Sequence, residues 1–412
     1  MNHQFELPGG YKKWTYGLIG VGVVALLYGF IMYHPFTHPA EGKDIDSTRF
    51  WAVLLQNSVY WLLTVNATMF FICITTMAMG GWQVAFRRVT EAISSVVPIL
   101  AVITFVILMA LVWGKRSDIY PWVDNVKVAA DPVLKGKSSF LSPTFFTIWS
   151  TIILVLWWLL GKKMRSLSLK TDDEGQMDYQ KGKKWIWDNT VYASLFVVVF
   201  TLSVASTLPW LWLMSIDAHW YSTMFSWYTF ASTFVAGISL IAIFVIFLKN
   251  RGQLEYVTDE HLHDLGKFMF AFSIFWTYLW FSQFMLIWYS NQPEETTYFK
   301  PRASGVYSGV FWLMFIINFI GPILILMSRG AKRNYTTMTF MALLIIFGHW
   351  LDFFQMVFPS TSKDHVPMLL YDFGIALGFV GLIMFVTARA MSKYPLLARN
   401  HPFVKESLIH HT

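Results

Sequence analysis

The chain has 412 residues, of which 56% are hydrophobic and only 13% charged, and its formal net charge is +7. Soluble domains are about a quarter charged, so this chain has too little polar surface to cover a water-exposed globule of its size. The composition therefore excludes an ordinary soluble protein. The Lys and Arg residues lie between apolar stretches rather than in one basic patch, which excludes a nucleic-acid partner.

Ten apolar stretches follow one another along the chain. Each approaches or exceeds the length that a tilted helix needs to cross about 30 Å of hydrocarbon. They occupy residues 14–33, 51–77, 95–113, 144–160, 191–213, 224–247, 267–289, 308–327, 337–358 and 369–388. The sequence therefore predicts an all-α membrane protein with ten transmembrane helices, in a single polytopic membrane domain over residues 1–412.

The basic residues of the connecting segments indicate how these helices are oriented. If the N-terminus is cytoplasmic, the cytoplasmic segments hold 21 of the 31 Lys and Arg residues, and the opposite segments hold the other 10. An excess of Lys and Arg marks the cytoplasmic side of a membrane protein. The loop 114–143 is an exception, with five basic residues on the outer side. The overall bias predicts that both termini are cytoplasmic.

Cysteine and histidine usage limits the cofactors that the chain could hold. Cys73 is the single cysteine, so the chain lacks the motifs for covalent haem, iron–sulfur clusters and thiolate zinc sites. Of the eleven His residues, only His349 lies deep in a predicted span, whereas a bis-His haem needs two. We expect no redox metal on this chain; haem ligation by one His and one Met is the alternative left open.

Ionisable groups inside the predicted spans are few, because each costs roughly 2.5 to 3.5 kcal/mol in hydrocarbon. His349 and Asp352 in the ninth span are three residues apart, so they share a helix face. Ser282 and Gln283 lie in the seventh span. We predict that these four residues belong to a quinone site or a proton path. The alternative is that they are hydrogen-bonded ties between helices.

Further polar residues gather where the spans reach the outer face. Five of them are candidate residues of that face: Asp217, His219, Glu294, Glu295 and Asp372. The cytoplasmic halves of the spans, by contrast, are almost purely apolar apart from Glu91 and Thr337. No Lys or Arg lies deep in a span, so we expect no buried cation.

Two segments resemble one known family. They are HDLGKFMFAFSIFWTYLWFSQFMLIWYSNQPEE at 263–295 and WLMSIDAHWYST at 212–223. Both are similar to the F-type (ActF) integral membrane subunit of bacterial alternative complex III, a quinol:cytochrome c oxidoreductase whose membrane subunits are NrfD-like. Ala218 stands where that family is expected to have Pro. The chain length and the ten spans agree with this resemblance.

The resemblance implies an architecture and an assembly. The second to fifth spans (51–213) and the sixth to ninth spans (224–358) would form two four-helix bundles, flanked by the first and tenth spans. The partners would be an NrfD-like sister subunit, a multihaem c-type cytochrome and an iron–sulfur protein, in the bacterial inner membrane among its lipids. Electrons from menaquinol or ubiquinol would pass to cytochrome c or directly to a terminal oxidase.

Within that assembly the resemblance gives this chain no redox metal and no independent catalytic activity. Its role would be scaffold, with a second quinone site or a proton path at the periplasmic side. Gln283 and Ser282 would face the interior of the second bundle, and Glu294 and Glu295 would face the periplasmic redox subunits.

Two other functions also fit ten spans. A secondary transporter would suit buried polar residues, but transporters typically have Gly- or Pro-broken helices at corresponding midplane positions. Pro98, Pro209 and Pro322 do not match that pattern. A purely structural membrane anchor fits if none of the buried polar groups exchanges protons.

Overall fold

The computed structural model describes residues 8–37, 45–173, 175, 177–363, 365 and 368–411. Throughout these residues the regular secondary structure is helical. Ten helices, some of them interrupted, are long and apolar enough to cross a membrane. The prediction of an all-α protein with ten candidate membrane spans is confirmed.

The α-helices are α1 (Gly9–Met32), α2 (Asp46–Met77), α3 (Arg87–Ser94), α4 (Val97–Trp113), α5 (Asn125–Ala130), α6 (Pro132–Lys137), α7 (Pro143–Asp173), α8 (Tyr179–Leu202), α9 (Leu208–Trp212), α10 (Met224–Lys249), α11 (Asp259–Ser290), α12 (Pro293–Ala303), α13 (Ser308–Phe315), α14 (Gly321–Leu326), α15 (Arg329–Arg333), α16 (Tyr335–Thr361), α17 (Leu370–Met391) and α18 (Val404–Leu408). Short 3-10 turns join several of them. Three of the candidate spans in the structure are composite, formed by α3 with α4, by α8 with α9, and by α13 with α14. The first of these starts at Arg87, before the predicted start at residue 95.

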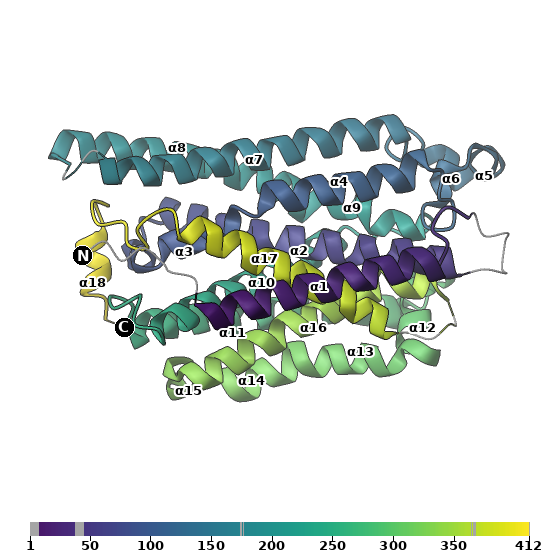
Figure 1. The fold of residues 1–412 in the computed structure, drawn as a ribbon. Helices are drawn as coiled ribbons and strands as arrows, with labels where there is room; N and C mark the ends of the chain where they lie inside the picture. Colours follow the sequence, from purple (N-terminus) through teal and green to yellow (C-terminus); the bar gives the residue numbers. More distant parts are fainter. Residues whose placement is uncertain are drawn as a thin grey trace.

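The helices run roughly parallel or antiparallel between two ends of the molecule (Figure 1). One end carries the start of α1, the end of α7, the start of α8, and α18, and is called the terminal face below. The other end carries α5, α6 and α12, and is called the far face. Because the number of spans is even, the start of α1 and the helix α18 lie at the same face.

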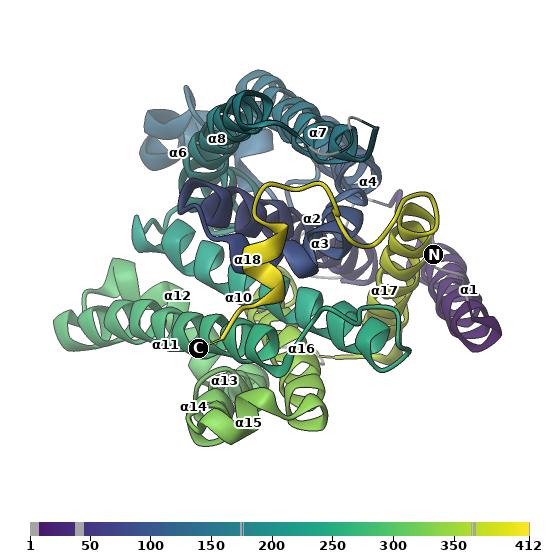
Figure 2. The same cartoon turned by 90° about the vertical axis from the view of Figure 1, so that its left-hand side faces the viewer.

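Two helices, α2 and α10, form the centre of the molecule. α2 packs against α4 and α8, and α7 packs against the same two helices. α10 packs against α11 and α16, and α13 also packs against α16. α2 meets α10 and α16 directly, while α1 packs mainly on α17 at the flank (Figure 2). Because α2 and α10 have little lipid contact, they can carry polar side chains.

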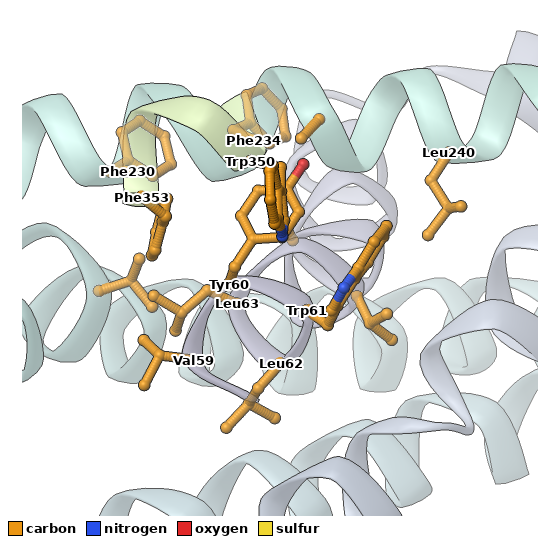
Figure 3. Packing of buried hydrophobic residues seen from close by; sticks show 14 of the residues in the cluster. Val59, Tyr60, Trp61, Leu62, Leu63, Phe230, Phe234, Leu240, Trp350 and Phe353 are labelled. Atoms are coloured by element: carbon orange, nitrogen blue, oxygen red, sulfur yellow. The ribbon is translucent and has the colours of Figure 1, made fainter. Parts of the chain in front are cut away.

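The contact between α2, α10 and α16 combines apolar packing with a few hydrogen bonds. Figure 3 shows residues 59–63 of α2 near Trp350 and Phe353 of α16 and near aromatic rings of α10. The Tyr60 hydroxyl donates to the backbone oxygen of Ile346 at 2.6 Å, and Trp350 Nε1 donates to Asn57 Oδ1 at 2.9 Å. These bonds fix how α16 lies on α2.

Two spans are interrupted by π-helical turns. Ser203–Thr207 lies between α8 and α9, and Ile316–Ile320 lies between α13 and α14. Each turn ends two residues before a proline, Pro209 or Pro322. Proline lacks an N–H group and crowds the preceding turn, and a π-bulge accommodates it. The sequence pattern did not predict these interruptions.

The expectation of no buried cation is wrong. Arg87 at the terminal face is 1% exposed, and its Nε lies 2.9 Å from Glu91 Oε1. Arg88 Nη2 lies 3.0 Å from Asp172 Oδ2. His401 lies in the same cluster, with its ring 4.7 Å from that of Trp185. These charges pair inside the protein, so they avoid the cost of an isolated buried ion.

Candidate functional site

Asp352 is the centre of a buried polar cluster between α10, α11 and α16. Its side chain is inaccessible to solvent. The Tyr228 hydroxyl of α10 donates to Asp352 Oδ1, and Trp276 Nε1 of α11 donates to Asp352 Oδ2 at 3.0 Å. The carboxyl group therefore joins all three helices, nine residues before α16 ends at the far face. That is about 14 Å along the helix axis.

His349 lies beside Asp352 without a hydrogen bond between them. Its Nδ1 is 3.8 Å from Asp352 Oδ2, which is too long for a hydrogen bond. Nδ1 instead shares a hydrogen bond with Ser232 Oγ at 3.0 Å. His349 Nε2 has no hydrogen-bond partner in the part of the chain that the structure describes. The predicted pair is thus brought together, but each member has its own partner.

The sequence of α10 explains why a serine meets His349. Thr229, Ser232 and Thr233 lie on one face of α10 and are completely buried. The two threonine hydroxyls donate to carbonyl oxygens of their own helix, at 2.8 Å for Thr229 and 3.0 Å for Thr233. Ser232 remains to contact α16. This local pattern positions one hydroxyl against the histidine ring.

A small cavity of about 10 Å³ lies next to this cluster on the side of the far face. Tyr228 forms part of its wall, together with Gln283 of α11 and with Tyr298 and Arg302 of α12. A space of this size is at the lower limit for one water molecule and far below the size of a ligand pocket. It can accommodate a water, but it cannot accommodate a quinone ring.

Arg302 connects this cavity to the far face. It is 3% exposed, and its Nη2 lies 3.1 Å from Asp217 Oδ2. Its guanidinium carbon lies 3.4 Å from the centre of the Tyr298 ring. Burial raises the pKa of Tyr298 to about 12, so this phenol is neutral at physiological pH. The predicted residue Asp217 is therefore linked to the cavity through an arginine.

Ser282 and Gln283 have different surroundings although they are adjacent. Gln283 is buried and lines the cavity, and its Nε2 donates to Ser222 Oγ at 2.8 Å. Ser282 is half-buried, and its hydroxyl donates to the Leu279 carbonyl of its own helix at 3.1 Å. Only Gln283 joins the group around Asp352.

The two glutamates after α11 lie at the surface. α11 ends at Ser290 and is followed by Asn291, which has a left-handed backbone with φ of 46°. Pro293 begins α12. Glu294 and Glu295 are both exposed in the first turn of α12. Carboxylates there interact favourably with the positive end of the helix dipole. They stabilise the start of α12 and remain accessible to a partner.

His219 and Asp372 lie at the far face but outside the Asp352 cluster. His219 is exposed and hydrogen-bonded to Asp131, and this bond is the main cause that lowers the pKa of Asp131. Asp372 is buried, with Oδ2 at 2.5 Å from Arg49 Nη2. That ion pair ties the start of α17 to the start of α2.

Several members of the cluster were not identified from the sequence. They are Tyr228, Ser232, Trp276 and Arg302. Tyr and Trp are common throughout this chain, so residue type alone did not distinguish Tyr228 and Trp276 from the other aromatic residues. The buried hydroxyl spacing of α10 could have indicated Ser232. Nothing in the loop sequence indicated that Arg302 would be buried.

The described residues contain no group of three or more His, Cys, Asp or Glu that could hold a metal ion. No protein-family model matches the chain, and no curated protein matches its sequence.

Proposed function

We propose that this chain is a membrane subunit of a respiratory quinol:cytochrome c oxidoreductase of the alternative complex III type. It has no redox metal of its own and lies in the bacterial inner membrane with its terminal face toward the cytoplasm. The observation that carries the proposal is the polar cluster of Asp352, with its chain of polar contacts toward the far face. The segments 212–223 and 263–295 supply the link to that class of complex.

The role of the cluster in this proposal is proton exchange. Arg302 holds Asp217 beside the cavity, and its guanidinium cannot itself accept a proton. A proton enters from the far face at Asp217. It reaches Asp352 through a water in the cavity and the Tyr228 hydroxyl, which is hydrogen-bonded to the carboxyl group. His349, whose Nδ1 lies 3.8 Å from Asp352 Oδ2, is the next ionisable side chain beyond Asp352. The small cavity favours this role over quinol binding at this place.

The architecture in this proposal consists of two four-helix bundles, formed by residues 51–213 and 224–358. The packing of α7 with α4 and α8, and of α13 with α16, supports it. The far face would be periplasmic and would meet the multihaem cytochrome and the iron–sulfur protein. Glu294 and Glu295 are exposed there and suit a basic partner surface.

Co-purification tests the assembly. The proposal expects the full-length chain to purify with an NrfD-like sister subunit, a multihaem c-type cytochrome and an iron–sulfur protein. A chain that purifies alone and exchanges a solute across vesicles would instead be a secondary transporter.

Substitution tests the proton role. Asp352→Asn keeps the shape of the side chain but removes its titration, so the complex should assemble and lose quinol:cytochrome c turnover at least several-fold. Tyr228→Phe should have the same effect in weaker form. Tyr120→Phe is the matched control, because that buried hydroxyl donates only to the Trp212 carbonyl, at 2.7 Å. Full turnover in an assembled Asp352→Asn complex would leave the chain as a structural anchor.

A further inference from the structure

A second cavity lies far from the Asp352 cluster, among α2, α4, α7 and α8. Its volume is about 140 Å³, and it lies toward the terminal face. One wall is the junction where α3 ends and α4 begins, next to Pro98. Trp157 of α7 and Phe196 of α8 form the opposite side. The break in the third span therefore leaves space inside this group of helices.

Asn66 of α2 contributes a polar group to this cavity. The residue is 1% exposed, yet its amide nitrogen has no hydrogen-bond partner among the residues that the structure describes. Buried donors are almost always paired, because an unpaired one loses the hydrogen bonds of water without replacement. An oxygen atom of a ligand in the cavity would satisfy this amide.

Two cations stand at the terminal side of the cavity. Lys162 and Arg165 line it, and both belong to α7, three residues apart on one helix face. Lys162 is exposed, and its Nζ lies 5.7 Å over the ring of Trp158. Among the described residues that line the cavity, none is Asp or Glu. The mouth of the cavity is thus suited to an anion.

An apolar groove continues from the cavity toward the middle of the membrane. Its volume is about 360 Å³, and it runs between α4 and α7. Pro98 and Trp158 line both the groove and the cavity, so the two spaces adjoin. Val102, in its wall, is 64% exposed. The groove therefore opens on the surface that would contact lipid.

We propose that the cavity and the groove together bind one anionic phospholipid from the leaflet at the terminal face. Its phosphate lies between Lys162 and Arg165, an ester carbonyl accepts the hydrogen bond of Asn66, and one acyl chain fills the groove. The order of these groups with depth matches that of a phospholipid, whose ester lies below its phosphate. A neutral quinone offers no anionic group to Lys162 or Arg165. This inference does not depend on the proposed function.

Native mass spectrometry of the delipidated full-length chain, in whatever complex it purifies, tests this site. The probes are dioleoyl phosphatidylglycerol, dioleoyl phosphatidylcholine and menaquinone. We expect the anionic lipid to bind more tightly than the zwitterionic one. The double variant Lys162→Gln, Arg165→Gln should weaken the binding of phosphatidylglycerol about 25-fold. Each cation near a lipid surface contributes about fivefold to the affinity for an anionic lipid. Phosphatidylcholine binding should change little.

Two further variants test the deeper contacts. Val102→Trp fills the groove and should weaken the binding of both phospholipids about tenfold or more. This is the effect expected if about two methylene groups of the acyl chain are no longer buried. Asn66→Leu should weaken both by removing the hydrogen bond. The matched controls are Lys163→Gln, whose Nζ lies over Tyr192 rather than in the cavity, and Val106→Trp, on the exposed side of α4 outside the groove. Both controls should bind like the original chain.

Several outcomes would overturn the proposal. One is equal binding of the two phospholipids by the original chain, and another is an anionic preference that survives the loss of both cations. A third is tight menaquinone binding that is lost in Asn66→Leu but not in the double Gln variant. If the double variant does not fold, the two Trp variants at the exposed surface of α4 still test whether a lipid binds in the groove. Equal lipid binding by Val102→Trp and Val106→Trp would refute the site.

Discussion

The contact between α1 and α17 allows a stability prediction with an internal control. Gly22 of α1 faces Gly378 of α17, and a Cβ added at Gly22 would lie 2.3 Å from the Gly378 Cα. Ordinary van der Waals contact begins near 3.4 Å, so Gly22→Ala forces the two backbones apart by about 1 Å. Backbone atoms cannot move aside as a flexible side chain can. Small residues that allow close approach are the usual basis of helix pairing in membranes.

The cost follows from the loss of packing. A gap of 0.5 to 1 Å removes roughly a quarter to a half of each van der Waals contact. Overpacking a tight contact costs typically about 1 to 3 kcal/mol. α1 has few other contacts, since it packs mainly on α17, so little else can compensate. We expect Gly22→Ala to lower the free energy of unfolding by about 1 to 3 kcal/mol.

Gly20→Ala is the matched control on the same helix. Nothing lies within 4 Å of a Cβ at Gly20, so this change removes no contact. It should leave stability unchanged or raise it by at most about 1 kcal/mol through helix propensity. The assay is SDS-induced unfolding of the purified chain in mixed micelles, followed by Trp fluorescence. If Gly22→Ala and Gly20→Ala unfold at the same SDS fraction, α1 and α17 are not packed as closely at Gly22 as this prediction requires.

Three further predictions concern other parts of the chain. Burial, and then the charges of nearby arginines, lower the pKa of His401 well below its ordinary value, so protonation favours the unfolded state. The free energy of unfolding should therefore fall as pH drops below about 6.5, by up to about 1.4 kcal/mol per pH unit. In unfolding titrations at several pH values, His401→Gln should show a smaller dependence of this free energy on pH. Arg302→Gln should lower the melting temperature far more than Lys300→Gln, a change at an exposed residue. Loss of Arg302 leaves the Tyr298 ring and the Asp217 carboxylate without their cation. Equal melting temperatures of the two variants would contradict this. Gly348→Ala should reduce the yield of folded protein, because its Cβ would lie 2.1 Å from the amide oxygen of Asn318; size-exclusion profiles matching the original chain would show that α13 and α14 can move aside.

The sequence alone determined the helices. Backbone polar groups need partners inside hydrocarbon, so an apolar stretch of sufficient length has to become a spanning helix. That rule placed all ten candidate spans, and helical spacing placed His349 and Asp352 on one face. It could not show that the two would lack a direct hydrogen bond, since that depends on side chains of α10 and α11.

The tertiary structure decided which surfaces are buried. In a membrane, lipid is as apolar as the protein interior, so hydrophobic periodicity does not show which face of a helix meets another helix. For that reason the sequence did not indicate that Tyr228 and Trp276 would bind Asp352, or that Arg302 would be enclosed. The sequence likewise did not indicate that the amide of Asn66 would be unpaired beside a cavity, because four separate helices surround that cavity. Such sites arise from where helices meet, and that depends on how side chains of separate spans fit together.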